Sequence, residues 1–155
     1  MYNDIIIFQH IAKTAGSSLA KILADHFPLD ARLAVVPNMP ASTLGTWPIE
    51  VVTKAWESLS LPQQQSIRLV GGHLRFGVHR VLPRTAKYIT LLRESVDRVL
   101  SSFYYSIDRH FQLTGEKVSL EDYVFRKRHY DLGLNNYQTR VLSGIPELDP
   151  FENIT

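Results

Sequence analysis

The feature that most constrains the fold is a run of apolar, mostly β-branched residues near the start of the chain, "IIIF" at 5–8 within "DIIIFQHI". A strand with one face in water alternates apolar and polar residues. This run does not alternate, so both of its faces must be buried. Strands of this kind belong to parallel sheets that are covered by helices on both faces. We therefore predict a central parallel strand over residues 4–11.

Strand and helix patterns alternate along the rest of the chain. Apolar residues at helical spacing predict a helix over 16–27 that stops at Pro28, and residues 28–48, which hold four prolines, read as a loop. Further strands are expected over 66–74 and 86–95, and helices over 49–60 (ending before Pro62), 95–110, 119–129 and 134–144. This alternation predicts an α/β sheet that binds its ligand at the carboxyl ends of the strands.

Composition narrows the class of protein. The 155 residues, 45% hydrophobic and 21% charged, show no repeat or shift in composition and fit a single domain over 1–155. The absence of cysteine excludes disulfides and thiolate metal sites and suits a reducing compartment. A net charge of +2 argues against a nucleic-acid or membrane-surface protein, and the N-terminal apolar run is too short for a signal peptide or a membrane span. The expected location is the cytoplasm; the oligomeric state stays open.

The segment after the first strand, "KTAGSS" at 13–18, has the composition of an anion-binding turn. Backbone N–H groups of a glycine-containing turn that leads into a helix converge on an anion, and Lys13 adds a full positive charge. Gly16 would allow the backbone to approach the anion closely, and the two serines offer hydroxyl donors. The alternative is an ordinary strand-to-helix connection with a serine cap and a surface lysine.

The order of residues in this turn differs from that of the nucleotide triphosphatase loop. In that loop, G-x-x-x-x-G-K-[ST], the lysine follows the glycines, and a Ser or Thr holds magnesium. Here Lys13 precedes Gly16, no glycine lies upstream of it, and neither later strand ends in an aspartate suited to a metal-bound triphosphate. An anion site without a metal is the better interpretation.

A second anion-binding element is expected at Arg93 and Ser101. Arginine offers a planar fork that matches a phosphate, and a serine hydroxyl two helical turns further on can add a donor. The alternative is that Arg93 pairs with Glu94 or Asp97 at the surface. Two anion sites at adjacent strand ends would suit a ligand phosphorylated at both ends.

Both stretches resemble segments of the sulfotransferase superfamily. This chain has "HIAKTAGSSL" and "LLRESVDRVLSSFYY". The branch that contains the heparan sulfate 2-O- and 6-O-sulfotransferases and their bacterial relatives typically has stretches like "HIPKTAGTSL" and "LLRDPVDRVLSHYY". "GGHLRFGVH" and "NNYQTRVLSG" resemble further segments of that branch in the same order, so the similarity spans most of the chain. The departures are Ala12 in place of the usual proline and Glu94-Ser95 in place of Asp-Pro.

The resemblance implies a fold and a cofactor. The fold is a P-loop-like three-layer α/β fold with a central, mainly parallel sheet flanked by helices. The cofactor is 3′-phosphoadenosine 5′-phosphosulfate (PAPS), which leaves as adenosine 3′,5′-bisphosphate (PAP). The 5′-phosphosulfate would lie on the turn and the 3′-phosphate on the second element. The implied cofactor-binding residues are Lys13, Thr14, Ala15, Gly16, Ser17, Ser18, Arg93 and Ser101.

The resemblance also implies metal-free, in-line transfer of a sulfuryl group to a hydroxyl of a small molecule or glycan. Lys13 would stabilise negative charge on the bridging oxygen, and His73 matches a histidine that acts as the catalytic base. His10 and His79 are alternative bases, and His73 read alone fits a strand-end residue bonded to backbone. Gln138, Thr139 and Arg140 match a stretch near the cofactor or the acceptor, without assigned contacts.

Two other functions stay open at this point. One is a P-loop nucleotide or metabolite kinase, and the other is a non-catalytic nucleotide-binding relative. In the resembling branch the catalytic domain continues well past the stretch like "NNYQTRVLSG", whereas this sequence stops at residue 155, which predicts a C-terminally shortened domain with an incomplete acceptor cleft. Animal members carry a Golgi membrane anchor, so its absence favours a bacterial protein.

Overall fold

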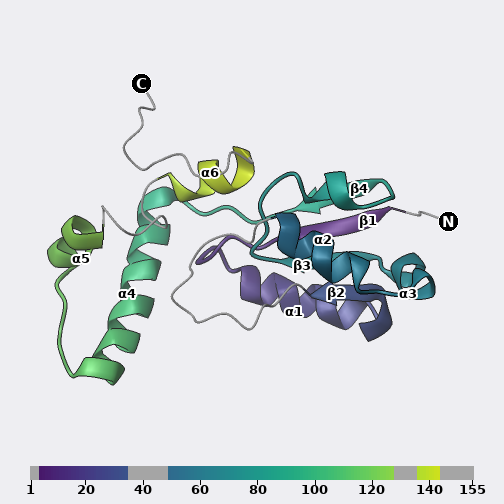
Figure 1. The fold of residues 1–155 in the computed structure, drawn as a ribbon. Helices are drawn as coiled ribbons and strands as arrows, with labels where there is room; N and C mark the ends of the chain where they lie inside the picture. Colours follow the sequence, from purple (N-terminus) through teal and green to yellow (C-terminus); the bar gives the residue numbers. More distant parts are fainter. Residues whose placement is uncertain (1–3, 35–48, 128–135, 144–155) are drawn as a thin grey trace.

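A four-stranded, all-parallel sheet in the order β2-β3-β1-β4 forms the centre of the computed structural model, which describes residues 4–34, 49–127 and 136–143 (Figure 1). The central strand β1 (Ile5–Gln9) pairs with β3 (Leu69–Gly72) on one side and with β4 (Ala86–Ile89) on the other. The edge strand β2 (Arg32–Ala34) pairs with β3. The predicted parallel α/β architecture is confirmed.

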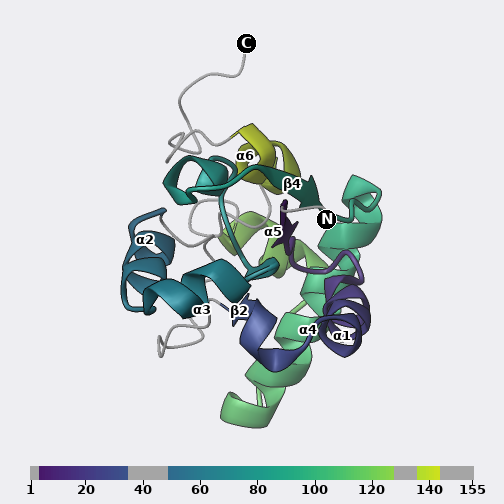
Figure 2. The same cartoon turned by 90° about the vertical axis from the view of Figure 1, so that its right-hand side faces the viewer.

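Helices cover both faces of the sheet because side chains of β1 alternate between them. Ile5 and Ile7 are fully buried in a core with Val52 and Trp56 of α2 (Ile49–Glu57). Phe8, on the opposite face, packs in a second core that includes side chains of α1 (Gly16–His26). Figure 2 shows α1 and α2 on opposite sides of the strands. The molecule therefore has three layers, and the unbroken apolar run of β1 follows from burial on both faces.

Two short elements differ from the sequence-based expectation. The region expected as loop contains a 3₁₀ turn, η1 (Leu29–Ala31), followed by strand β2. Helix α3 (Leu61–Ser66) begins with Pro62 in its first turn, and Ser60 forms a capping box with Gln63. Proline is tolerated in the first turn because its missing N–H has no partner there anyway. Pro62 thus lies inside the start of a new helix and does not mark a loop.

The third predicted strand is shorter than expected. It ends at Ile89, the residue that pairs with Phe8, and does not continue to Arg93. Beyond this point the Thr90 hydroxyl donates to the Gln9 carbonyl over 2.8 Å. A side chain thus bonds to the β1 carbonyl that a backbone N–H would have bonded if the strand pairing had continued. Arg93 therefore lies in the link between β4 and the next helix.

Three further helices follow β4 along the chain. The first, α4 (Ser95–Thr114), runs past its predicted end at 110 and is capped by Gly115, whose φ is 74°. Next come α5 (Leu120–Lys127) and α6 (Tyr137–Ser143). Their predicted ends at 129 and 144 lie outside the described residues. Figure 1 shows α5 beside α4, away from the sheet, and α6 near the start of α4.

Helix α6 is tied to the end of β1. Gln9 is 1% exposed, and its Nε2 donates to the carbonyls of Leu74 (3.1 Å) and Val141 (3.0 Å). The N–H of Phe76 donates to the same Val141 carbonyl over 3.2 Å. Tyr137 and Val141 of α6 pack on Ile11 in a third buried cluster. A buried amide and a small apolar cluster thus fix the last described helix beside the ends of β1 and β3.

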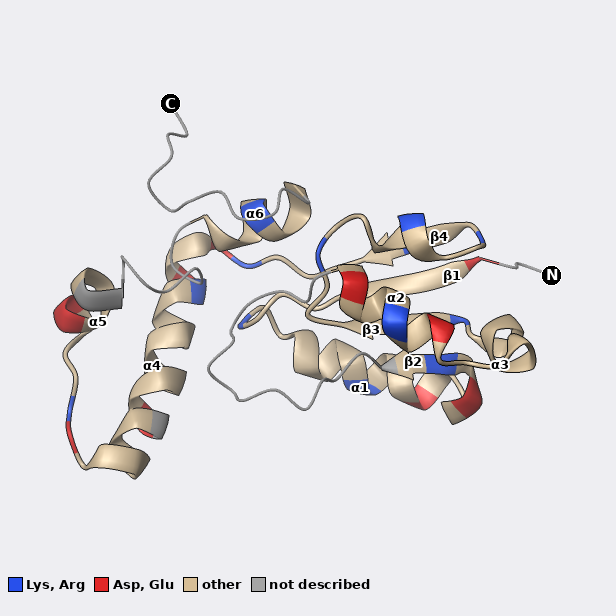
Figure 3. Ribbon diagram, viewed as in Figure 1, with Lys and Arg blue, Asp and Glu red and all other residues tan. Residues whose placement is uncertain are grey.

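Basic and acidic positions are interspersed over the described elements and do not gather on one face (Figure 3). None of the described helices combines the length and the apolar composition needed to cross a membrane.

We expect Gln9→Leu to lower the free energy of unfolding by about 2–3 kcal/mol, because it removes both donors that bridge the buried Leu74 and Val141 carbonyls. Urea denaturation followed by circular dichroism measures this change. Gln65→Leu, at an exposed position of α3, is the matched control and should change stability by about 0.5 kcal/mol or less. Equal stability of the two variants would contradict the bridging role of Gln9.

Candidate functional site

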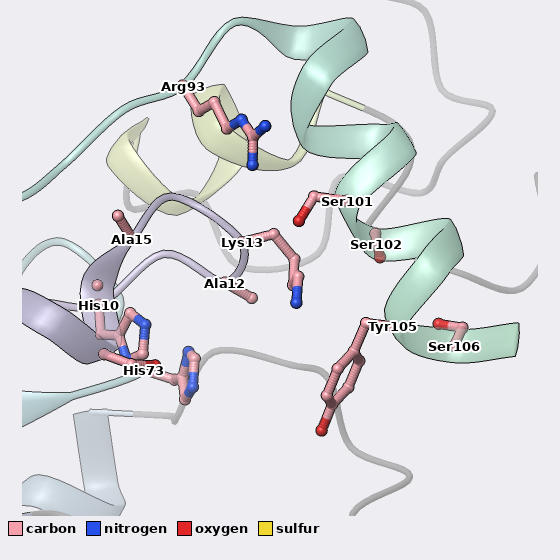
Figure 4. Close-up of a pocket in the computed structure, with 12 residues that line it drawn as sticks. His10, Ala12, Lys13, Ala15, His73, Arg93, Ser101, Ser102, Tyr105 and Ser106 are labelled. Atoms are coloured by element: carbon pink, nitrogen blue, oxygen red, sulfur yellow. The ribbon is translucent and has the colours of Figure 1, made fainter. Parts of the chain in front are cut away.

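A cavity of about 480 Å³ lies at the carboxyl ends of β1, β3 and β4, against α4 (Figure 4). Because β3 and β4 flank β1 in a parallel sheet, the three segments that follow these strands leave from one edge. Figure 4 shows Arg93 at one end, His10 and His73 at the other, and Lys13 between them. The lining residues are His10, Ala12, Lys13, Ala15, Gly16, Ser17, His73, Arg93, Ser101, Ser102, Tyr105 and Ser106.

Most of the predicted site residues are therefore brought together. Thr14 and Ser18 are the two that do not line the cavity. The side chain of Thr14 is buried, and its hydroxyl donates to the Ile11 carbonyl over 2.8 Å. This bond braces the turn from inside, so the Thr14 hydroxyl is engaged away from the cavity.

The backbone of the β1–α1 turn has the shape of an anion-binding nest. Lys13 and Ala15 adopt left-handed conformations with φ of 69° and 64°, and Thr14 between them does not. Alternation of this kind points successive N–H groups toward one concavity. A non-glycine residue in this region costs about 1–3 kcal/mol, which the surrounding packing must offset. Such strain is common where a backbone has to be held in a binding geometry.

Helix α1 begins at this turn without a side-chain cap. Its N-cap is Ala15, and no side chain accepts from the first-turn N–H groups. The N–H of Ser18 turns back to the Ala15 carbonyl at 3.1 Å. The structure therefore does not show the serine cap of the alternative interpretation. An uncapped helix start with its positive dipole end at a cavity favours an anion there.

Gly16 has no side chain, and the His10 ring occupies the space that a side chain there would need. A Cβ on Gly16 would lie 2.0 Å from Cδ2 and 2.3 Å from Nε2 of His10, so any side chain would displace the ring. The His10 ring in turn stacks on His73, with centroids 4.4 Å apart and an interplanar angle of 20°. It also stacks on Phe8, with ring centroids 5.6 Å apart. Gly16, His10 and His73 therefore form one packed series.

Both stacked histidines are held in the neutral form. Burial lowers the pKa of His10 from 6.5 to about 4, and the neighbouring His73 adds to this effect. Burial also lowers the pKa of His73, and a hydrogen bond with the His10 backbone opposes part of that change. At neutral pH, His73 thus has a ring nitrogen that can accept a proton.

The two cations of the cavity have no carboxylate partner among the described residues. The Nζ of Lys13 lies over the Tyr105 ring, 4.2 Å from its centroid. Arg93 makes no ion pair with Glu94 within 4 Å, although its charge acts on that carboxylate from further away; Oε2 of Glu94 accepts the Asp97 N–H at 2.8 Å and caps α4. That hydrogen bond is the main cause of the lowered pKa of Glu94. The surface-pairing alternative for Arg93 is therefore not seen, and both cations are available to an anion.

The other candidate base, His79, lies outside the cavity. The Tyr88 hydroxyl accepts the N–H groups of Gly77 and His79 at 3.1 Å each and lies 3.0 Å from Nδ1 of His79. Since a hydroxyl with two N–H donors directs its own proton elsewhere, it donates to Nδ1. His79 is thus fixed in a cluster with Tyr88 rather than at the site.

Sequence reasoning missed one group of residues at the site and left the contacts of Gln138 unassigned. Ser102, Tyr105 and Ser106 line the cavity from α4, and their three- and four-residue spacings put them on the same face of the helix. Gln138 holds the backbone of Arg93: its Oε1 accepts the Arg93 N–H at 3.0 Å, and its Nε2 donates to the Arg93 carbonyl at 2.8 Å. Helical spacing could have revealed the group on α4. The resemblance places Gln138 near the cofactor or the acceptor, but its hydrogen bonds with Arg93 join residues 45 apart and are seen only in the folded chain.

A second cavity of about 590 Å³ adjoins the first along α4. Ser106 lines both cavities. The remaining lining comes from α4, the segment before α5, and α5 itself: Ile107, His110, Glu116, Lys117, Val118, Asp122 and Tyr123. This lining contains charged side chains of both signs. Within it, Nε2 of His110 lies 3.8 Å from Oε2 of Glu116.

The three-layer parallel fold, with a cationic cavity beyond the ends of three strands, defines an α/β protein with a candidate anion-binding site. Residues 2–136 match the family model described as galactose-3-O-sulfotransferase, and the chain belongs to this family. Neither the curated proteins nor the solved structures contain a significant match to the chain. The predicted sulfotransferase family is thus confirmed in general, whereas the match does not single out the heparan sulfate 2-O- and 6-O- branch.

Acidification should destabilise the fold through His10. The unfolded chain protonates this residue below its ordinary pKa of 6.5, while the folded protein resists protonation until about pH 4. The contribution of His10 to stability is therefore fully present above pH 6.5 and is lost as the pH falls from 6.5 toward about 4. Because the ring is only half-buried, we expect a loss of about 1–2 kcal/mol.

Urea denaturation at about pH 7 and about pH 4.5 measures this loss. His10→Asn should lose less stability over the interval than the wild type. His26→Asn, at an exposed position near the end of α1, is the control and should follow the wild type. An undiminished loss in His10→Asn would show that His10 does not cause the effect.

Proposed function

We propose that the protein is a PAPS-dependent sulfotransferase that transfers a sulfuryl group to a hydroxyl of a saccharide. One observation carries this proposal: Lys13, Arg93 and the uncapped start of α1 line a single cavity. The family match supports sulfuryl transfer in general. The donor, the acceptor and the roles of individual residues are our inference.

The residues of the cavity fit a donor that is anionic at both ends. The nest at Lys13 and Ala15, with the first-turn amides of α1, suits the 5′-phosphosulfate. Arg93 and Ser101 lie on the other side and suit the 3′-phosphate. A cavity of about 480 Å³ is within the usual range for sites that enclose a small ligand. Ser17 lines the cavity and can add a hydroxyl donor, whereas Ser18 would contribute only through its place in the first turn.

The bound donor supplies a sulfuryl group, whose bond to a phosphate oxygen breaks as the acceptor oxygen bonds to sulfur. Lys13 stabilises the negative charge that develops on that phosphate oxygen. Its ammonium group now lies over Tyr105, so it is already held inside the cavity. His73, kept neutral by burial, accepts the proton of the attacking hydroxyl. His10 supports His73 by stacking and packs against Gly16.

The second cavity is our proposed site for the acceptor. It adjoins the donor cavity at Ser106, so a molecule bound there can direct a hydroxyl toward the first cavity. Its lining mixes Lys117 and His110 with Glu116 and Asp122, which provide donors and acceptors for hydroxyl groups. A lining of mixed sign suits a neutral saccharide better than a polyanionic chain such as heparan sulfate. This agrees with the galactose acceptor in the name of the matching family.

The donor assignment predicts that PAP binds and that Lys13→Ala and Arg93→Ala each weaken binding about 10- to 100-fold, since each removes charge-assisted hydrogen bonds. Isothermal titration calorimetry measures the affinities. Lys21→Ala, at an exposed position of α1 outside the cavity, should bind like the wild type. Absence of PAP binding would sink the proposal. Magnesium-dependent ATP binding in its place would favour the kinase alternative.

The base assignment predicts that His73→Asn retains PAP affinity but lowers kcat by about 10²- to 10⁴-fold. Transfer from PAPS to lactose, followed by mass spectrometry, provides the rate. Since burial lowers the pKa of His73, the wild-type rate should fall only below pH 6.5. Undiminished turnover by His73→Asn would remove His73 as the base. PAP binding by the wild type without transfer to any saccharide would favour the non-catalytic alternative.

A further inference from the structure

We propose that Gln138 is a positioning residue that fixes Arg93 for the 3′-phosphate of the donor. The inference rests on the proposed function, because it takes Arg93 as the contact for that phosphate. It assigns to α6, which does not line the donor cavity, a specific part in donor binding.

One side chain takes both main-chain polar groups of Arg93. The Gln138 carboxamide accepts from the Arg93 N–H at 3.0 Å and donates to the Arg93 carbonyl at 2.8 Å, across a sequence separation of 45 residues. A neighbouring strand would satisfy a residue in the same way, with one donor and one acceptor. Because β4 ends at Ile89, Arg93 lies beyond the sheet ladder. Gln138 thus substitutes for a missing strand neighbour.

Gln138 is itself held in place by its own helix. Val141, one turn further along α6, accepts hydrogen bonds at its carbonyl from Gln9 Nε2 and from the Phe76 N–H. Tyr137, the preceding residue, is 5% exposed and packs with Ile11. These anchors come from β1 and from the segment after β3. The Gln138 carboxamide therefore holds the Arg93 backbone in a fixed position relative to the sheet.

The position of the Arg93 backbone matters because little else holds the side chain. Arg93 is exposed and makes no ion pair with a carboxylate in the described part of the chain. A guanidinium binds a phosphate best when its planar fork meets two oxygens, which requires a defined starting point for a long side chain. A displacement of about 1 Å is enough to weaken such an arrangement. The two hydrogen bonds of Gln138 supply the starting point.

The chemistry of the clamp requires a carboxamide. Glutamate could accept from the Arg93 N–H but would set a second oxygen against the Arg93 carbonyl and add a negative charge beside the phosphate site. Alanine removes both hydrogen bonds. Thr139, the next residue of α6, is exposed and does not line the cavity, so Thr139→Ala is a matched control on the same helix.

The test compares two ligands that differ at the 3′ position. PAP carries the 3′-phosphate, and adenosine 5′-monophosphate is the same molecule without it. We expect Gln138→Ala and Gln138→Glu to weaken PAP binding about tenfold in calorimetry, with the affinity for adenosine 5′-monophosphate unchanged. Thr139→Ala should bind both ligands like the wild type. Thermal unfolding of each variant verifies that α6 remains folded.

A purely structural role of Gln138 would weaken both ligands equally, and that result overturns the inference. Unchanged PAP affinity in Gln138→Ala, while Arg93→Ala loses it, also overturns the inference and leaves the proposed function standing. A wild type that does not bind PAP, or an Arg93→Ala variant that binds it fully, overturns the proposed function and this inference together. The ligand-selective loss is the outcome that supports it.

Discussion

The position of β1 between β3 and β4 is the constraint on which the rest of the site depends. Parallel pairing puts the carboxyl ends of the three strands at one edge, and Ile7 lies in register with Val70 on one side and Tyr88 on the other. The ladder toward β3 continues one step past β1, since the His10 N–H donates to the Gly72 carbonyl at 2.8 Å. The anion-binding turn, the histidine pair and the link to Arg93 therefore start from one rigid edge. Burial of β1 on both faces stabilises this arrangement.

The electrostatics of the cavity follow from what surrounds it. Burial keeps the two histidines neutral, so the positive charge of the cavity comes from Lys13 and Arg93. Neither cation forms an ion pair with a carboxylate in the described segments. Lys13 lies over an aromatic ring, a contact that holds a cation without neutralising it. Both cations can thus form charge-assisted contacts with a bound anion. This favours an anion-binding cavity over an arrangement that merely stabilises the fold.

Sequence patterns predicted the elements whose signals are local. The unbroken apolar run of β1 and the helical spacing of α1 and α4 depend only on nearby residues, and the structure has all three elements. Strand β2 escaped prediction because three residues of an edge strand are defined by pairing with β3 and not by their own pattern. Arg93 was expected to end a strand because apolar residues continue beyond Ile89, but the partner residues of β1 end first. The contact of His10 with Gly16 likewise depends on packing that no motif encodes.

The two sides of the cavity therefore differ in how the chain specifies them. The turn at Lys13 is determined within a few residues: the Thr14 hydroxyl bonds the Ile11 carbonyl, and Ala15 takes the conformation that starts α1. Arg93 is determined from a distance, through a carboxamide 45 residues away on a helix anchored to Gln9. A local motif can therefore describe the backbone of the Lys13 turn, whereas the position of Arg93 is determined only in the folded chain. Replacing the Gln138 carboxamide can thus alter the Arg93 side and leave the geometry of the Lys13 side intact.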